Sequence, residues 1–244
     1  RALLVQARTP ITYWGFQYCL PLLRKEAAYP PLGLVTVAAL LPAHWDVRLV
    51  DLNIEPLSDG HLGWADVVLV SGMLIQSESI HAALARAKAL GKTTVLGGAA
   101  ASSSPELFDS ADYIFQGEAE GRLQPLLDAL DGQHSAAARI FSDADIERPE
   151  MSTVPVPRFD LLPFAKYASM SVQYSRGCPY HCAFCDVTVL FGQRPRTKTS
   201  AQIIAELEAL GDLGRFDLLL FADDNLIGNK KTLKADLLPA LINW

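Results

Sequence analysis

Three cysteines stand within eight residues of this sequence, and their spacing is its strongest chemical signal. Cys178, Cys182 and Cys185 follow a C-x3-C-x2-C pattern, whereas the remaining cysteine, Cys19, is far upstream. Zinc sites built from cysteine usually use two separated pairs, and the sequence offers no second pair. An iron–sulfur cluster is held by thiolates, normally four. Three thiolates would therefore leave one iron of a [4Fe–4S] cluster open to an exogenous ligand.

The cysteine spacing, with the aromatic Phe184 before the last cysteine, resembles the signature of the radical S-adenosylmethionine (SAM) superfamily. The resemblance implies that Cys178, Cys182 and Cys185 hold a [4Fe–4S] cluster, that SAM chelates its free iron, and that Phe184 lies near the adenine of SAM. In that superfamily the reduced cluster cleaves SAM to a 5′-deoxyadenosyl radical. Two other interpretations stay open: a zinc site completed by His181, and a redox pair formed by the last two cysteines.

The composition describes a globular chain without an obvious macromolecular partner. Of its 244 residues 50% are hydrophobic and 20% charged, which predicts one large or two modest domains. A net charge of −6 argues against nucleic acid as a partner. The longest apolar stretch, residues 32–41, is too short to cross a bilayer, so no transmembrane segment is expected. An iron–sulfur site and crowded cysteines predict a reducing compartment, and hence the cytoplasm.

Short apolar runs alternate with helical patterns upstream of the cysteines. The expected strands are residues 2–6, 47–50, 67–70, 93–96 and 113–115, and the expected helices are 32–41, 77–90 and 120–130. This alternation predicts an α/β fold with an open parallel sheet of the Rossmann-like, flavodoxin type. Ligands of such sheets bind above the carboxyl ends of the strands.

Two of the predicted strand ends carry residues that suit a bulky ligand. Ser71 and Met73 follow one strand, and Gly97-Gly98 closes the next. Glycine lets the backbone approach a ligand closely, and a polar loop can hydrogen-bond a phosphate. These elements resemble those of cobalamin-binding Rossmann-like domains, which implies that Ser71, Met73, Gly97 and Gly98 surround the nucleotide tail of cobalamin. An ordinary tight turn at the two glycines stays open as the alternative.

The first strand is followed by a long aromatic-rich segment, residues 10–29, rather than by the histidine motif common in cobalamin domains. A loop of this length is usually functional, and we expect either a lid over a ligand or packing on the domain surface. His61 is expected to lie in a loop, so the cobalt of a bound cobalamin should lack a protein histidine ligand. Cys19 is expected to be a small buried apolar residue.

Prolines replace the alternating pattern between residues 136 and 167, which predicts a linker. Residues 1–135 are then expected to form the cobalamin-binding domain. Residues 168–244 would form the start of a radical SAM βα-barrel, in which strand 170–174 delivers the cysteine loop at its carboxyl end. Because only about two strand–helix units follow the linker, against about six in the superfamily barrel, the chain is expected to be a fragment with an uncovered sheet face.

The second predicted barrel strand, residues 218–221, ends at Asp223 and Asp224. The resemblance implies that these two carboxylates take the place of the polar motif that binds the SAM amino group, since a carboxylate can accept hydrogen bonds from an ammonium. N-capping of a helix is the alternative role for either aspartate. A helix between the two strands is expected to be capped by Ser200 and to end at Gly211.

Taken together, the motifs resemble those of cobalamin-dependent radical SAM enzymes, closest to the hopanoid C-2 methylase group through residues 29–33, 191–196 and 223–225. The resemblance implies a radical SAM methyltransferase that methylates an unactivated carbon of a small-molecule or polycyclic lipid substrate. Its cofactors would be a [4Fe–4S] cluster, SAM and cobalamin, with an electron donor such as flavodoxin or ferredoxin. The alternatives are a radical rearrangement or cyclisation without methyl transfer, and a non-catalytic module that binds cobalamin or an iron–sulfur cluster. Neither the substrate nor a catalytic residue can be named from the sequence.

Overall fold

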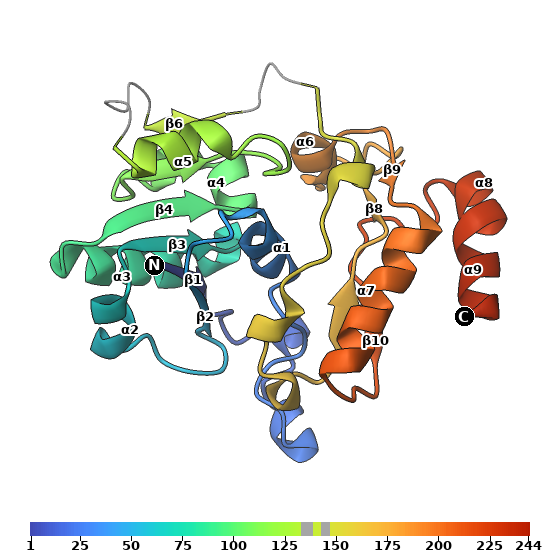
Figure 1. Cartoon of the computed structure of the whole chain (residues 1–244), viewed down its shortest axis with the longest axis horizontal. Coiled ribbons are helices and arrows are strands. Elements are labelled where there is room, and N and C mark those ends of the chain that lie inside the picture. The colour runs from blue at the N-terminus through green and yellow to red at the C-terminus, as the bar shows by residue number, and fades with distance from the viewer. Residues whose placement is uncertain (133–138, 143–146) are drawn as a thin grey trace.

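A six-stranded parallel sheet forms the N-terminal part of the protein (Figure 1). The computed structural model describes residues 1–132, 139–142 and 147–244. The strands are β1 (Ala2–Gln6), β2 (Val47–Asp51), β3 (Val67–Ser71), β4 (Thr93–Gly97), β5 (Tyr113–Phe115) and β6 (Ile140–Phe141). Their order in the sheet is β2-β1-β3-β4-β5-β6, and every neighbouring pair is parallel. The prediction of a Rossmann-like α/β sheet is confirmed.

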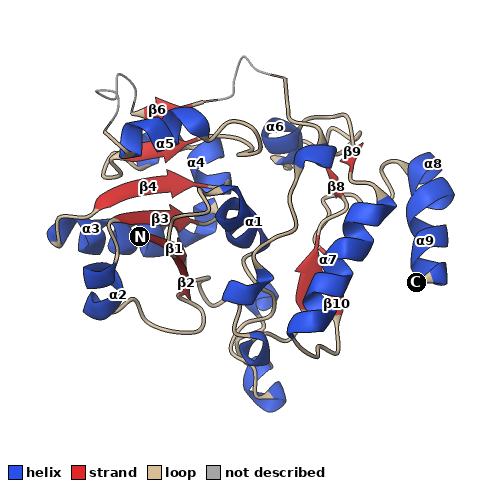
Figure 2. Cartoon of the chain, in the orientation of Figure 1, coloured by secondary structure: helices blue, strands red, loops and turns tan. Residues whose placement is uncertain are grey.

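Helices cover both faces of this sheet (Figure 2), which is why its central strands are apolar on both sides. The helices are α1 (Leu32–Leu40), α2 (Asp59–Trp64), α3 (Ser77–Ala89), α4 (Ala99–Ser103) and α5 (Gln124–Leu130). On one face, α3 buries Ile80 and Leu84 against β1, β3 and β4. On the other face, α1 and α5 bury Leu34 and Leu126.

Several features of this part differ from the sequence-based expectations: α5 begins at Gln124 rather than at residue 120, and α2 and α4 were not expected. Strand β6 pairs with β5, so the sheet continues past residue 135, where the linker was expected to begin. His61 lies in α2 rather than in a loop, because its ring and the Ser58 hydroxyl form a reciprocal cap at the start of that short helix. The expectation that Cys19 is buried was wrong, since this side chain is exposed beside the short helical turn Leu20–Leu23. The domain boundaries themselves stay predictions.

The C-terminal part contains one strand–helix–strand unit of the kind found in βα-barrels. Strand β7 (Met170–Val172) pairs in parallel with β10 (Leu219–Phe221). Helix α7 (Ser200–Leu213) lies between these two strands in the sequence. Thr199, rather than Ser200, is the N-cap of α7, because its hydroxyl accepts a hydrogen bond from the Gln202 backbone amide. Further short elements are the strands β8 (Ser175–Arg176) and β9 (Arg196–Thr197), and the helices α6 (Val187–Phe191), α8 (Lys230–Thr232) and α9 (Leu238–Asn243).

The two parts pack directly against each other. The Arg158 amide donates to the Val35 carbonyl of α1 (2.9 Å), and the Tyr167 hydroxyl donates to a carboxylate oxygen of Asp51 at the end of β2 (3.1 Å). Tyr167 and Phe159 are buried in one cluster with Val35. Burial raises the pKa of Asp51, although its hydrogen bonds with Asn53 and Tyr167 act in the opposite direction.

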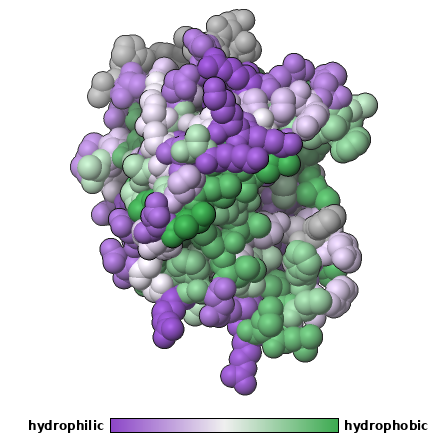
Figure 3. Space-filling view, turned by 90° about the vertical axis from the view of Figure 1, so that its right-hand side faces the viewer, coloured by the Kyte–Doolittle hydropathy of each residue, from purple (hydrophilic) through white to green (hydrophobic). Residues whose placement is uncertain are grey.

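The side of the molecule that carries α7, α8 and α9 has a broad apolar area (Figure 3). Large apolar side chains exposed in or next to these elements and β10 are Leu213, Leu218, Leu220, Ile227, Leu238, Ile242 and Trp244. The β7–β10 sheet has only these two strands among the described residues. Over the same described ranges, no helix has the length and apolar character needed to cross a membrane.

A buried ion pair lies beneath the start of α7. The Lys198 ammonium contacts the Glu206 carboxylate, and both side chains are at most 3% exposed. Burial lowers the pKa of Lys198 and raises the pKa of Glu206. Each charge is therefore held in an apolar environment mainly by the other.

Replacing Lys198 by methionine should leave the Glu206 carboxylate buried without its partner. We expect the free energy of unfolding, measured by urea titration of the purified chain, to fall by about 3–5 kcal/mol. The control Lys231→Met changes an exposed lysine and should cost less than about 0.5 kcal/mol. The double variant Lys198→Met/Glu206→Leu should recover most of the loss. A double variant as unstable as the single one would contradict this explanation.

Candidate functional site

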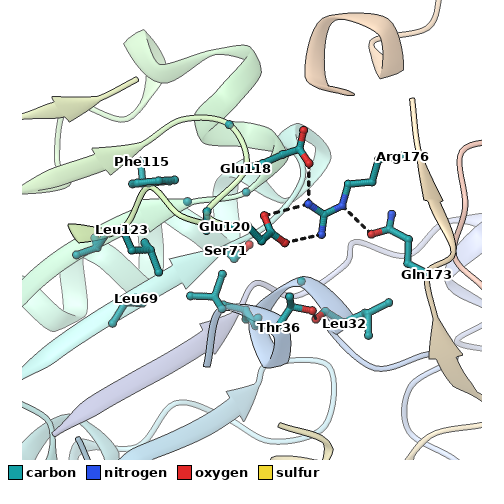
Figure 4. A pocket seen from close by; sticks show the side chains of 18 of the residues that line it. Leu32, Thr36, Leu69, Ser71, Phe115, Glu118, Glu120, Leu123, Gln173 and Arg176 are labelled. Carbon is teal, nitrogen blue, oxygen red and sulfur yellow. Dashed lines mark hydrogen bonds and ion pairs between the residues drawn. The ribbon is translucent and has the colours of Figure 1, made fainter. Parts of the chain in front are cut away.

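A pocket of about 330 Å³ opens above the carboxyl ends of β3, β4 and β5 (Figure 4). It runs down beside the sheet between α1 and α5. Its apolar walls are Leu34, Val37, Leu69, Val95, Phe115, Leu123 and Leu126. The position agrees with the general rule for ligands of open α/β sheets. The shape, apolar along its walls and polar at its opening, suits a ligand with an aromatic or apolar end.

Three of the four residues predicted to surround a nucleotide tail line this pocket. They are Ser71, Gly97 and Gly98. Gly98 has a φ of +84°, and a β-carbon there would clash with the Ser71 hydroxyl. A β-carbon at Gly97 would have room, since its nearest neighbour is the Phe115 carbonyl oxygen at 3.9 Å. Gly98 is therefore required by the backbone, whereas Gly97 keeps the pocket open.

The fourth residue, Met73, lines a neighbouring pocket of about 480 Å³ instead. This second pocket lies above the ends of β1 and β2 and is bounded by part of the aromatic-rich segment, residues 10–17. In this pocket the Gln76 amide donates to the Ala7 carbonyl (2.8 Å) and to the Thr9 hydroxyl (2.9 Å). The aromatic-rich segment thus borders a cavity, as a lid would, but not the one that contains the two glycines.

Charged side chains stand at the opening of the first pocket (Figure 4). Arg176 donates to Glu120 through both terminal nitrogens (2.8 and 3.1 Å) and to Glu118 through one of them (2.7 Å). Its Nε donates to the amide oxygen of Gln173 (2.9 Å). The two terminal nitrogens of Arg196 donate to the two carboxylate oxygens of Glu118 (2.6 and 3.1 Å). We call Glu118, Glu120, Arg176 and Arg196 the arginine–glutamate cluster.

The cluster is almost completely buried, since none of its four side chains is more than 10% exposed. Burial alone would raise the pKa of Glu120, but the hydrogen bonds and positive charge of Arg176 outweigh it, so this pKa lies below its ordinary value. Two carboxylates and two guanidinium groups balance in charge. The lowered pKa keeps Glu120 ionised at neutral pH.

The cysteine loop begins and ends at the β8–β9 ribbon, whose antiparallel register places Arg176 directly opposite Arg196. The Cys178 amide donates to the Gly192 carbonyl (3.2 Å), and the Cys185 amide donates to the Cys182 carbonyl (3.1 Å). All three thiols are free. The Phe184 side chain is 92% exposed and contacts no ligand-binding pocket described above.

The three thiols fit a three-thiolate centre in number and in chemistry, because they share one short loop and none is used in a disulfide. In the part of the chain that the structure describes, however, no three cysteine, histidine, aspartate or glutamate side chains are gathered closely enough to hold a metal ion. Asn225 already donates to the Cys178 sulfur (3.4 Å). Cluster assembly would then require the loop to draw Cys182 and Cys185 inward.

Asp223 and Asp224 lie beside the cysteine loop, as predicted, but neither caps a helix. Asp223 accepts hydrogen bonds from the Tyr174 amide (3.1 Å) and from both the amide and hydroxyl of Ser175. Asp224 makes one long contact with the Gly177 amide (3.4 Å). Burial raises the pKa of both carboxyls. Asp223 thus anchors the end of β7, and Asp224 is the freer of the two to bind a ligand.

The arginine–glutamate cluster was missed by the sequence analysis. Its signals were visible: Glu118 lies between the predicted strand 113–115 and the predicted helix that starts at Glu120, and Arg176 and Arg196 flank the cysteine loop. Nothing in the sequence, however, shows that residues about 60 positions apart meet in one buried group, as Arg176 and Glu118 do. The predicted SAM and metal roles of the aspartates, Phe184 and the cysteines stay predictions.

Comparisons with known proteins agree with this arrangement. A family model described as the B12 binding domain matches residues 23–127. An uncharacterized methyltransferase of Synechocystis is 41% identical over 100% of this chain and 45% of its own length. The hopanoid C-2 methylase of Rhodopseudomonas palustris is 38% identical over 100% of this chain and 46% of its own length. The chain thus spans just under half the length of these curated relatives.

One solved structure shares the fold over the whole chain. The cobalamin-dependent S-adenosylmethionine radical enzyme OxsB, solved with aqua-cobalamin and S-adenosylmethionine bound, superposes with a TM-score of 0.71. The match covers 100% of this chain and 37% of OxsB, at 19% sequence identity. At that identity the likeness concerns the arrangement of the elements alone.

Gly177, which joins Arg176 to Cys178, gives a test of the loop geometry. Its φ is +93°, and a β-carbon would lie 2.8 Å from the Arg194 carbonyl oxygen and 3.0 Å from that of Gly192. We expect Gly177→Ala to lower the free energy of unfolding by about 1–3 kcal/mol, measured by chemical denaturation. In the control Gly211→Ala, a helical glycine with open space around it, stability should rise by about 0.5–1 kcal/mol. Equal stability of the two variants would contradict the strained turn.

Proposed function

We propose that this chain belongs to the cobalamin-binding radical SAM enzymes and supplies the cofactor-binding part of a methyltransferase acting on an unactivated carbon. One juxtaposition carries the proposal: the pocket beside Gly97 and Gly98 is also lined by Arg176, two residues before Cys178, and by Phe191, within the loop that carries the three free thiols. A methyl donor and a radical source must both reach the same carbon, and this arrangement would hold them close together.

The first pocket is proposed to take the nucleotide tail of cobalamin. Its apolar walls between α1, α5 and the sheet would bury an aromatic base. Gly97 leaves space for the tail, and Ser71 and the backbone at Gly98 offer polar groups at the opening. The described residues place no histidine in the lining of this pocket, so we propose that cobalt binds without a histidine ligand from it.

The cysteine loop is proposed to hold a [4Fe–4S] cluster through Cys178, Cys182 and Cys185, with SAM near Phe184 and Asp224. When bound, the reduced cluster with SAM would supply radical chemistry, and cobalamin would supply the methyl group. The chain's own contribution is to fix the two ends of the loop beside the pocket. Asp223 and Gly177 serve this task by fixing the end of β7 and the turn into the loop.

The substrate proposed is a small molecule or a polycyclic lipid, since the Rhodopseudomonas relative carries the name of a hopanoid methylase. The activity is proposed for the whole protein, because the curated relatives are about twice as long as this chain. An iron–sulfur cluster of this kind needs an electron donor such as flavodoxin or ferredoxin. It also favours a reducing compartment, for which we propose the cytoplasm.

Isotopic labelling of SAM tests the proposed reaction. We expect the full-length protein, reconstituted anaerobically with cobalamin and a polycyclic lipid, to transfer the labelled methyl group to the product. The Cys182→Ala variant should retain little iron and form no product, whereas Cys19→Ala, outside the loop, should behave as the wild type. Formation of 5′-deoxyadenosine without label in the product would support a rearrangement or cyclisation instead. Absence of SAM cleavage would support a non-catalytic binding module.

Filling the first pocket tests the cobalamin site separately. In Gly97→Leu the new side chain can be accommodated by the backbone but occupies the space beside Phe115. Overpacking of about 1.4 kcal/mol would weaken cobalamin binding about tenfold, measured by absorbance titration, while iron content stays unchanged. The control Gly63→Leu adds the same side chain in α2, where nothing lies within 4 Å. Unaltered cobalamin affinity in Gly97→Leu would rule out this pocket as the site.

A further inference from the structure

The arginine–glutamate cluster connects the first pocket to both ends of the cysteine loop. Glu118 lies between Arg176 and Arg196, and Glu120 pairs with Arg176. We propose that Glu118 and Glu120 are positioning residues, which couple ligand binding in the pocket to the conformation of the cysteine loop. This inference rests on the proposed function, because it takes the pocket ligand to be cobalamin and the loop ligand to be an iron–sulfur cluster.

The same side chains face the pocket and hold the loop. Glu118, Glu120 and Arg176 all line the pocket opening, where Figure 4 shows them pointing toward one another. Arg176 stands two residues before Cys178, and Arg196 closes the ribbon at the far end of the loop. A ligand that contacts the carboxylates therefore acts on the loop through a single layer of hydrogen bonds.

The buried position makes this connection stiff. Each member of the cluster is at most 10% exposed, so its charges are satisfied mainly by one another rather than by bulk solvent. Separating one ion pair would leave an unpaired charge in an apolar environment, which costs far more than a small movement of the whole group. When the glutamates shift to accommodate a ligand, the two arginines and the ribbon that carries them should shift as well.

The two glutamates should not contribute equally. Glu118 bonds both arginines, so it reaches both ends of the loop. Among the described residues, the Glu120 side chain bonds Arg176 alone, and Gln173 offers that arginine a further partner (2.9 Å). Loss of the Glu118 charge should therefore remove more of the coupling than loss of the Glu120 charge.

The coupling can be measured as a ratio of two dissociation constants. Cobalamin is titrated by absorbance into the full-length protein with its reconstituted cluster, and into the Cys182→Ala protein that lacks it. In the wild type we expect the two values to differ about tenfold, within the usual range of coupling between sites. The ratio should fall to within about twofold of one in Glu118→Gln and to an intermediate value in Glu120→Gln. The exposed Glu106, changed to glutamine as a control, should leave the wild-type ratio.

The ratio separates a positioning role from a merely structural one. A variant that only loses stability weakens cobalamin binding by the same factor in both forms and leaves the ratio unchanged. A wild-type ratio in Glu118→Gln would overturn the proposal, and so would a ratio of one in the wild type. A wild-type protein that binds neither cobalamin nor iron would instead overturn the proposed function, and the coupling with it.

A second variant covers the case in which Glu118→Gln does not fold. Arg196→Lys keeps the positive charge but loses the planar fork that contacts both oxygens of Glu118. We expect Arg196→Lys to lower the ratio of the two cobalamin dissociation constants about threefold or more relative to the wild type. Protection of the Cys178 amide against hydrogen exchange should also rise on cobalamin binding in the wild type and not in this variant. Wild-type values of both quantities would overturn the proposal.

Discussion

Two arginines face each other across the β8–β9 ribbon, and like charges placed directly opposite in an antiparallel pair repel. The ribbon can form only because Glu118 accepts from both guanidinium groups and Glu120 from one. Those carboxylates come from the loop after β5, in the other part of the chain. The base of the cysteine loop therefore depends on a surface that the N-terminal sheet provides, and neither half completes this region alone.

The charges make the contact between the two parts specific rather than strong. Burying four ions costs solvation free energy that their mutual attraction only partly returns, and apolar packing around Tyr167 and Phe159 supplies the attraction. A misaligned docking of the two parts would bury at least one charge without a partner, which is heavily disfavoured. Apolar contacts thus bring the parts together, and the ions select one orientation.

Local patterns predicted the fold well, because each strand of the sheet is a short apolar run with a polar or glycine end. Residues 2–6 and 113–115 were predicted with the observed bounds. Strand β6 was missed because Ile140–Phe141 is too short to show a period and forms only by pairing with β5. In the site, Ser71, Gly97 and Gly98 were found from strand-end chemistry, whereas Met73 faces a different cavity. The ion cluster was beyond reach, since it depends on contacts between distant segments.

The antiparallel register of the ribbon also fixes which two residues form the ends of the cysteine loop. Side chains alternate between the faces of a strand, so a slip of one residue would turn Arg196 away from Glu118 and present Pro195 or Thr197 in its place. A proline or threonine cannot neutralise a buried carboxylate. Any insertion or deletion between the two arginines must then be absorbed inside the loop itself, as a bulge, while its two ends remain pinned. The part of the loop between Cys185 and Arg196 is free to change in sequence and in length, whereas the cysteine spacing and the two anchoring arginines are not.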